Sequence, residues 1–184
     1  LVSLSGRQLY RDQSLAVAHD IVRVLNDRDD SPLYLDIKLL GVGKGSVAQA
    51  PLAQELKKLF QTDAFGGARK TQDFHDEARR FFVNYLKQIA TVFQAAWNGR
   101  KYSIRSSTAL RAFIRVAPDV VRRLDEEHVD RTDFRAIGRV IAPWGHRIGD
   151  LRFETQGAFG KGTTVDGLAK ELRLALHYPE GTMG

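Results

Sequence analysis

The sequence has no cysteine, which excludes a disulfide-stapled scaffold and any zinc site built on thiolates. It has no apolar run near the ~18 residues that a membrane span needs, and no signal-peptide pattern at its start. We therefore expect a cytoplasmic protein without membrane contact. The chain begins with Leu1 rather than methionine, so we interpret it as a fragment of a longer protein.

The sequence also lacks the common catalytic patterns. Its five histidines form no His-Glu-x-x-His pair, and there is no Gly-x-Ser-x-Gly elbow and no cysteine nucleophile. Nothing marks a pair of carboxylates for acid–base chemistry. We therefore expect a non-catalytic chain without cofactor or metal, although catalytic groups that converge from distant segments would leave no such pattern.

The composition fits one folded domain over residues 1–184. Hydrophobic residues make up 43% of the sequence and charged residues 27%, which is enough apolar material for a core. The formal net charge is +6, from 28 basic and 22 acidic residues.

The whole charge excess lies in one stretch, residues 100–123, which we call the basic window. It contains one acidic residue, Asp119, and seven basic ones: Arg100, Lys101, Arg105, Arg111, Arg115, Arg122 and Arg123. The arginine fork pairs well with phosphates, so the window predicts contacts with a nucleic-acid backbone. The alternatives are a solvated face, or pairing with acids of another segment such as Asp125, Glu126 and Glu127.

Apolar residues at helical spacing predict about six helices. The expected ranges are 12–26, 51–60, 72–97, 106–117 with a second piece over 119–127, 132–142 and 165–177. The division in the fourth range comes from Pro118, which we expect to break or kink the helix. The aromatic stripe of the third range, from Phe74 to Trp97, is predicted to be core and not a base-stacking platform.

A small β-element is expected between the first two helices. Residues 34–40 form a short apolar run, glycines recur over 41–45, and residues 46–48 follow, which predicts a hairpin. A phosphate loop is the alternative there, but the Walker tripeptide is absent. The predicted fold class is thus mainly α, a bundle-like fragment of an α+β protein with about six helices and a small β-hairpin.

A second glycine-rich loop, residues 157–164, leads into the last predicted helix. Gly160, Lys161, Gly162 and Thr163 are its candidate phosphate-binding residues, because backbone N–H groups and a lysine would meet the positive end of a helix dipole. Its order departs from the Walker spacing by one inserted glycine. The alternative interpretation is a linker to a docking helix.

One succession of residues resembles a known family. Leu25-Asn26 leads to Ser31-Pro32 and Tyr34, and a later stretch from Asn84 to Ile89 leads to Val92-Phe93 and Trp97. This order resembles the C-terminal half of DGQHR-domain proteins, which include the DndB-like proteins of bacterial DNA-modification islands. The similarity spans residues 12–121. The Asp-Gly-Gln-His-Arg motif itself, which belongs to an N-terminal ParB/sulfiredoxin-like part, is absent, so no family site residue can be carried over.

The resemblance implies DNA-linked biology: DNA modification, phage defence or transcription regulation. Our first hypothesis is therefore a non-catalytic DNA-binding or regulatory module, whose partners are DNA and other proteins of a modification or defence operon. The second is a protein-interaction or dimerisation module, with a homo-oligomer among its forms. The third is part of a nucleotide-dependent enzyme that uses the loop at 157–164.

Overall fold

The computed structural model describes residues 6–39, 43, 45–62, 65 and 72–177, and it is mainly α-helical with one small sheet. The elements in chain order are α1 (Gly6–Asp27), β1 (Ile37–Lys38), β2 (Val47–Ala48), α2 (Gln49–Leu59), α3 (Gln72–Val92), α4 (Gln94–Asn98), α5 (Ser107–Glu126), α6 (Phe134–Ile141), α7 (Pro143–Arg147), the 3₁₀ helix η1 (Asp150–Phe153) and α8 (Val165–His177). The mainly α prediction is confirmed. Among the described residues, six helices have eight or more residues, and α4 and α7 add five each.

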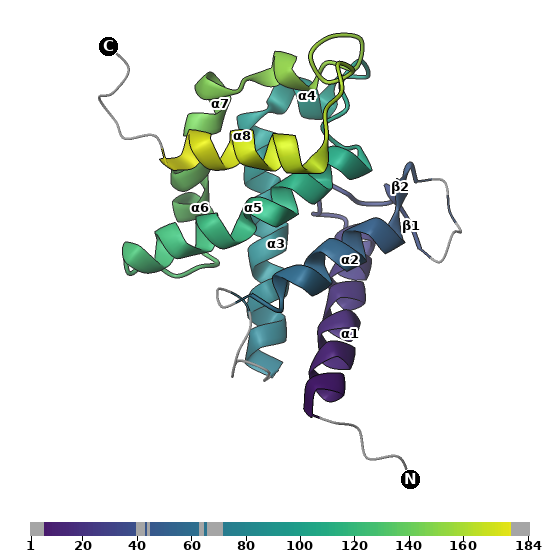
Figure 1. The fold of residues 1–184 in the computed structure, drawn as a ribbon, viewed down its shortest axis with the longest axis vertical. Helices are drawn as coiled ribbons and strands as arrows, with labels where there is room; N and C mark the ends of the chain where they lie inside the picture. Colours follow the sequence, from purple (N-terminus) through teal and green to yellow (C-terminus); the bar gives the residue numbers. More distant parts are fainter. Residues whose placement is uncertain (1–5, 40–42, 44, 63–64, 66–71, 178–184) are drawn as a thin grey trace.

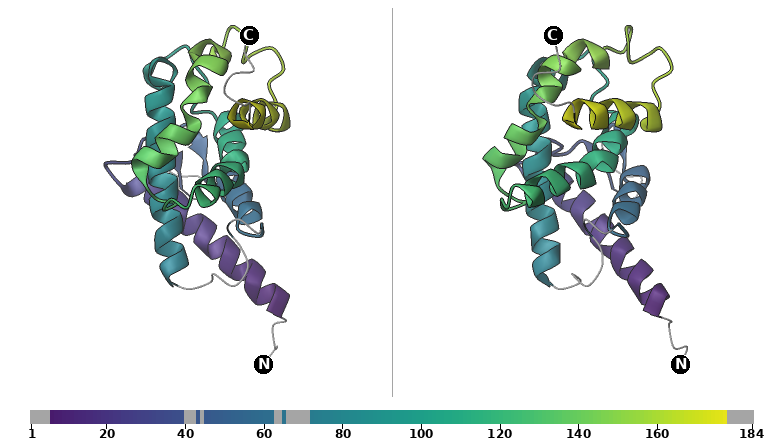
Figure 2. Two further views of the ribbon diagram at one scale, coloured as in Figure 1. Left: turned by 90° about the vertical axis from the view of Figure 1, so that its left-hand side faces the viewer. Right: turned by 60° about the vertical axis from the view of Figure 1, so that its left-hand side comes forward.

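Helix α5 lies at the centre of the packing. It contacts α2, α6 and α8, while α1 packs against α2 and α3, and α3 packs against α6. In Figure 1, α8 lies above α5 and α2 below it, with α3 running behind all three. The side views in Figure 2 show α3 on the opposite side of the molecule from α8. The predicted helix over residues 165–177 is confirmed as α8.

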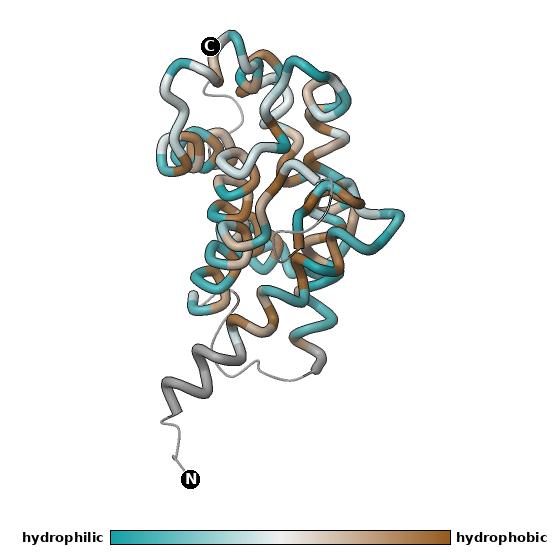
Figure 3. The backbone as a smooth tube through the Cα atoms, turned by 90° about the vertical axis from the view of Figure 1, so that its right-hand side faces the viewer, coloured by the Kyte–Doolittle hydropathy of each residue, from teal (hydrophilic) through white to brown (hydrophobic). Residues whose placement is uncertain are grey.

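The aromatic stripe of α3 is core, as predicted. Phe81, Phe82, Tyr85 and Phe93 are all at most 1% exposed, and Phe82 and Phe65 stack on each other. Apolar positions recur along the helices in Figure 3, which is the pattern that buries one face of each helix. These rings are therefore unavailable for stacking on bases.

The predicted break at Pro118 is wrong, because α5 runs unbroken through this residue. Pro118 has no N–H to donate to the carbonyl of Ile114, four residues earlier. Tyr85 supports the same turn from α3, because its buried hydroxyl donates to the neighbouring Phe113 carbonyl at 2.7 Å. Packing of a fully buried helix segment outweighs the local cost of the proline.

The predicted single helix over 72–97 is divided at Phe93, whose φ of −112° and ψ of 51° separate α3 from α4. The carboxylate of Asp150 accepts the Ala96 N–H at 2.8 Å. In a continuous helix this N–H would instead donate a hydrogen bond to the carbonyl of Val92. A distant acidic residue thus ends α3, and the local sequence gives no sign of it.

The predicted hairpin is also wrong, because β1 and β2 are parallel, with Ile37 opposite Val47. Gly45 passes so close to the Asp36 carbonyl that a Cβ there would lie 2.3 Å from its oxygen. The chain has therefore returned to the start of β1 before β2 begins, which sets the parallel direction. Most of the glycine-rich turn at 41–45, with its phosphate alternative, lies outside the described residues.

The described helices contain none that is both long and apolar enough to cross a bilayer. Within the same part of the chain, no three histidine or acidic side chains gather as a metal site would require.

Candidate nucleic-acid interface

Two arginines of the basic window are bound to a buried carboxylate. Glu55 of α2 is only 3% exposed, and its oxygens accept hydrogen bonds from Arg111 and Arg115 of α5. The closest N···O distances are 3.1 Å for Arg111 and 2.6 Å for Arg115. Arg115 also pairs with Asp166 at the start of α8. These two guanidiniums therefore join α2, α5 and α8, and a phosphate would have to compete with Glu55.

Two further carboxylates, at the C-terminal half of α5 and just after it, also bind two arginines each. Asp119 binds Arg122 and Arg173, with N···O distances of 3.6 and 3.1 Å. Glu127 binds Arg123 at 3.5 Å and Arg139 at 2.7 Å. The hydrogen bond from Arg139 is the main reason why the pKa of Glu127 is lowered.

Each of these three carboxylates thus binds two arginines: Glu55 binds two from α5, whereas Asp119 and Glu127 each bind one from α5 and one from another helix. Pairing with acids was one alternative to phosphate contacts for the basic window. It is observed for four of its arginines: Arg111, Arg115, Arg122 and Arg123. Glu127 was among the acids that the sequence suggested, but Glu55 and Asp119 were not. Because Asp125 and Glu126 also lie at this end of α5, its surface carries nearly balanced charge.

The first three residues of the basic window lie elsewhere, in the connection between α4 and α5. Arg100 and Lys101 are exposed, and the Lys101 side chain is 68% accessible. Lys101 approaches Glu154 only loosely, at 3.6 Å, whereas Arg105 pairs with Asp36 at 2.9 Å. Within the described part of the chain, no ion pair or hydrogen bond engages the Arg100 side chain.

The structure brings the glycine-rich loop next to this connection. Tyr102 forms an antiparallel bridge with Glu154, and the Thr155 N–H donates to the Lys101 carbonyl at 2.9 Å. Gly160 in turn contacts Thr155, because a Cβ on it would lie 2.3 Å from the Thr155 carbonyl oxygen. Lys161, the next residue, is exposed.

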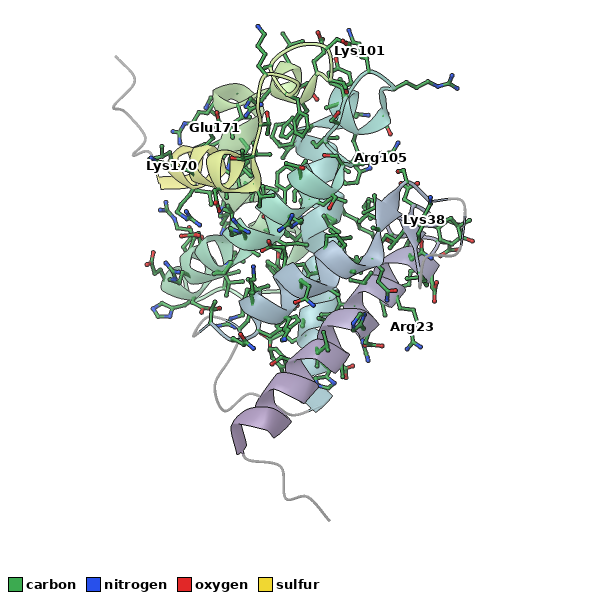
Figure 4. The ribbon with its side chains drawn as sticks, turned by 45° about the vertical axis from the view of Figure 1, so that its right-hand side comes forward. Arg23, Lys38, Lys101, Arg105, Lys170 and Glu171 are labelled. Atoms are coloured by element: carbon green, nitrogen blue, oxygen red, sulfur yellow. The ribbon has the colours of Figure 1, made fainter. Side chains whose placement is uncertain are left out.

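We call Arg100, Lys101 and Lys161 the Lys101 surface. Figure 4 shows Lys101 at the end of the molecule where the loop folds over, with Arg105 and Lys38 further along the same side. Among the described residues, these three cations form one ion pair, between Lys101 and Glu154, whereas Arg122 and Arg123 at the end of α5 are both paired.

The loop itself does not present a helix N-terminus to a ligand. The Thr164 side chain accepts the Gly167 N–H at 3.0 Å, and Asp166 stands in the first turn of α8. A cap and a carboxylate thus occupy the positive end of this helix dipole. Arg152 holds Thr163 through a 2.9 Å hydrogen bond and also pairs with Glu171. Of the loop residues named from the sequence, Lys161 is the one that adds a charge to the Lys101 surface.

The basic window and the loop each have a signal in the sequence, but nothing in the sequence predicts that they meet. The bridge between Tyr102 and Glu154 joins segments 52 residues apart and rests on backbone hydrogen bonds, which no side-chain pattern encodes. In comparisons with protein-family models, curated proteins and solved structures, the chain matched no family model, no curated protein and no solved structure.

Proposed function

We propose that the chain binds the phosphate backbone of nucleic acid through the Lys101 surface. The observation that carries the proposal is the convergence of two sequence-separated cationic segments, residues 100–101 and the loop with Lys161, at one exposed end. Lysine and arginine near phosphates release condensed counterions, which is the main source of sequence-independent affinity. Such contacts give affinity and register without base readout.

The resemblance to DGQHR-domain proteins makes DNA the expected polymer. On that reading the chain is a non-catalytic, cytoplasmic, regulatory or DNA-binding module of a bacterial DNA-modification or defence system. This assignment stays a prediction. It would gain support from an Asp-Gly-Gln-His-Arg motif in the residues that precede Leu1 in a longer protein.

The proposal is tested by removing the three charges together. The variant Arg100→Ala/Lys101→Ala/Lys161→Ala should bind a fluorescent random-sequence duplex or single strand roughly 100-fold more weakly at low salt. The matched control is Arg23→Ala/Lys57→Ala/Arg80→Ala, which removes the same charge from α1, α2 and α3 and should bind nearly as the parent does. Equal losses in both variants would show that net charge, and not this surface, governs binding.

A protein-interaction role is the second candidate, and a groove between α7 and α8 favours it. The groove has a volume of about 570 Å³ and is lined by Ile148, Leu174 and Ala175 together with charged residues. Leu174 is 61% exposed and adds apolar surface to this groove, and exposed apolar surface at a groove marks contact sites. Sedimentation of the parent and of Leu174→Lys over a range of concentrations tests this role: a mass that rises with concentration only in the parent supports it.

A further inference from the structure

One tyrosine, Tyr102, accompanies the cations of the Lys101 surface. Tyr102 follows Lys101 directly, and the Lys101 ammonium lies 5.6 Å from the centre of its ring. A cation and a half-buried aromatic ring therefore lie side by side at this end.

The Tyr102 ring is held in place on its protein side. Its backbone is fixed by the bridge with Glu154, and the ring packs against Gly99, where a Cβ would lie 2.6 Å from ring atom Cδ2. Any larger residue at position 99 would displace the ring. The Lys101 side chain beside the ring is by contrast long, exposed and flexible, so it can move aside for another flat group.

We propose that the Lys101 surface takes single-stranded nucleic acid, with an unpaired base stacked on Tyr102. This inference rests on the proposed function and names its substrate class. Single-strand sites combine cations that follow the backbone with aromatic rings on which bases stack, and every base offers a flat face for this. In a duplex the bases are already stacked and paired, so none is free to stack on the Tyr102 ring.

The shape of this end also favours a single strand. Duplex readers place a long helix or a two-stranded ribbon in the major groove. The cations here come from the α4–α5 connection and from a loop, and the adjoining helix α4 has five residues. Neither segment projects a recognition helix.

Three labelled probes of equal length, about 12 nucleotides, separate the outcomes. They are a thymine single strand, the same strand with abasic sites throughout, and a duplex. The parent chain should bind the thymine strand roughly 5- to 100-fold more tightly than the abasic strand, because stacking adds to backbone contacts. Tyr102→Leu should lose most of that difference and leave binding of the abasic strand unchanged.

Phe134→Leu is the control, because it removes another solvent-accessible ring, 44% exposed, from α6 rather than from the Lys101 surface. It should leave all three affinities unchanged. Equal binding of thymine and abasic strands by the parent chain, or tighter binding of the duplex, would overturn this inference while backbone binding stands. Binding of none of the three probes at low salt would overturn the proposed function itself. The comparison of probes uses the parent chain, so it decides the matter even if Tyr102→Leu fails to fold.

Discussion

Glu55→Gln tests the conclusion that Arg111 and Arg115 are structural. The substitution keeps the shape of a side chain that is 3% exposed but removes the charge that both guanidiniums bind. Removing one partner of a fully buried ion pair costs about 3–5 kcal/mol. The two arginine side chains are 34% and 27% exposed, so water can replace part of what they lose, and Arg115 keeps Asp166.

We therefore expect a loss of about 2–3 kcal/mol in the free energy of unfolding, since a hydrogen bond to a charged group contributes about 1.5–3 kcal/mol. For a chain of this size the melting temperature should fall by about 4–12 °C. Thermal and urea unfolding followed by circular dichroism measure both quantities. Glu171→Gln is the control: Glu171 also binds an arginine, but it is 48% exposed, and its loss should cost less than about 1 kcal/mol.

The same variant separates structure from binding. Glu55→Gln leaves Arg111 and Arg115 positively charged and frees them from their carboxylate. If they contacted phosphates, nucleic-acid affinity should rise; we expect it to stay unchanged in the folded variant. A loss of stability no larger than that of Glu171→Gln, or a clear gain in affinity, would refute the conclusion that Arg111 and Arg115 are structural.

Two further predictions concern the fold. Tyr85→Phe removes the buried hydroxyl that donates to the Phe113 carbonyl near Pro118. It should lower the free energy of unfolding by about 1 kcal/mol, measured by urea unfolding. An unchanged urea midpoint would show that the hydroxyl does not support this turn. Acid should also destabilise the chain, because the pKa of Glu127 is lowered by its hydrogen bond with Arg139 and that of Asp130 by its bonds with Thr132. A lowered pKa in the folded state contributes stability above the unfolded value, and this contribution is lost as the pH falls through the folded value. Urea midpoints at about pH 7 and pH 3 should therefore differ less in Glu127→Gln than in the parent chain, and an equal difference would contradict the coupling.

The helical part of the fold could be predicted because the signal is local. The apolar stripe of α8 and the serine cap of α5 depend on residues that are close together in the sequence. The structure has both: α8 forms over the predicted range, and the Ser106 hydroxyl accepts the Ala109 N–H at 3.2 Å. The errors arise where a group that is distant in the sequence determines the course of the backbone. Asp150 ends α3, Tyr85 supports the turn at Pro118, and the approach of Gly45 to Asp36 makes the strands parallel.

The positive charge of the candidate site could be predicted from the sequence. Which of its basic residues pair with acids of the fold, and which stay exposed, could not. The excess charge of residues 100–123 is visible in the sequence, but the sequence does not show that Glu55 and Asp119 bind three of its arginines. Nor does it show that the loop with Lys161 folds against the segment of Lys101, because the bridge between Tyr102 and Glu154 depends on the packing of η1 against α4.

The most direct test of the central claim is the salt dependence of binding. Fluorescence anisotropy of the parent chain with random-sequence DNA, from about 50 to 200 mM salt, gives the number of counterions released. Three phosphate contacts by the Lys101 surface predict a log–log slope of roughly −3 on a duplex or −2 on a single strand, and a slope near zero for the triple alanine variant. Absence of binding at the lowest salt, or an unchanged slope in that variant, would contradict the account.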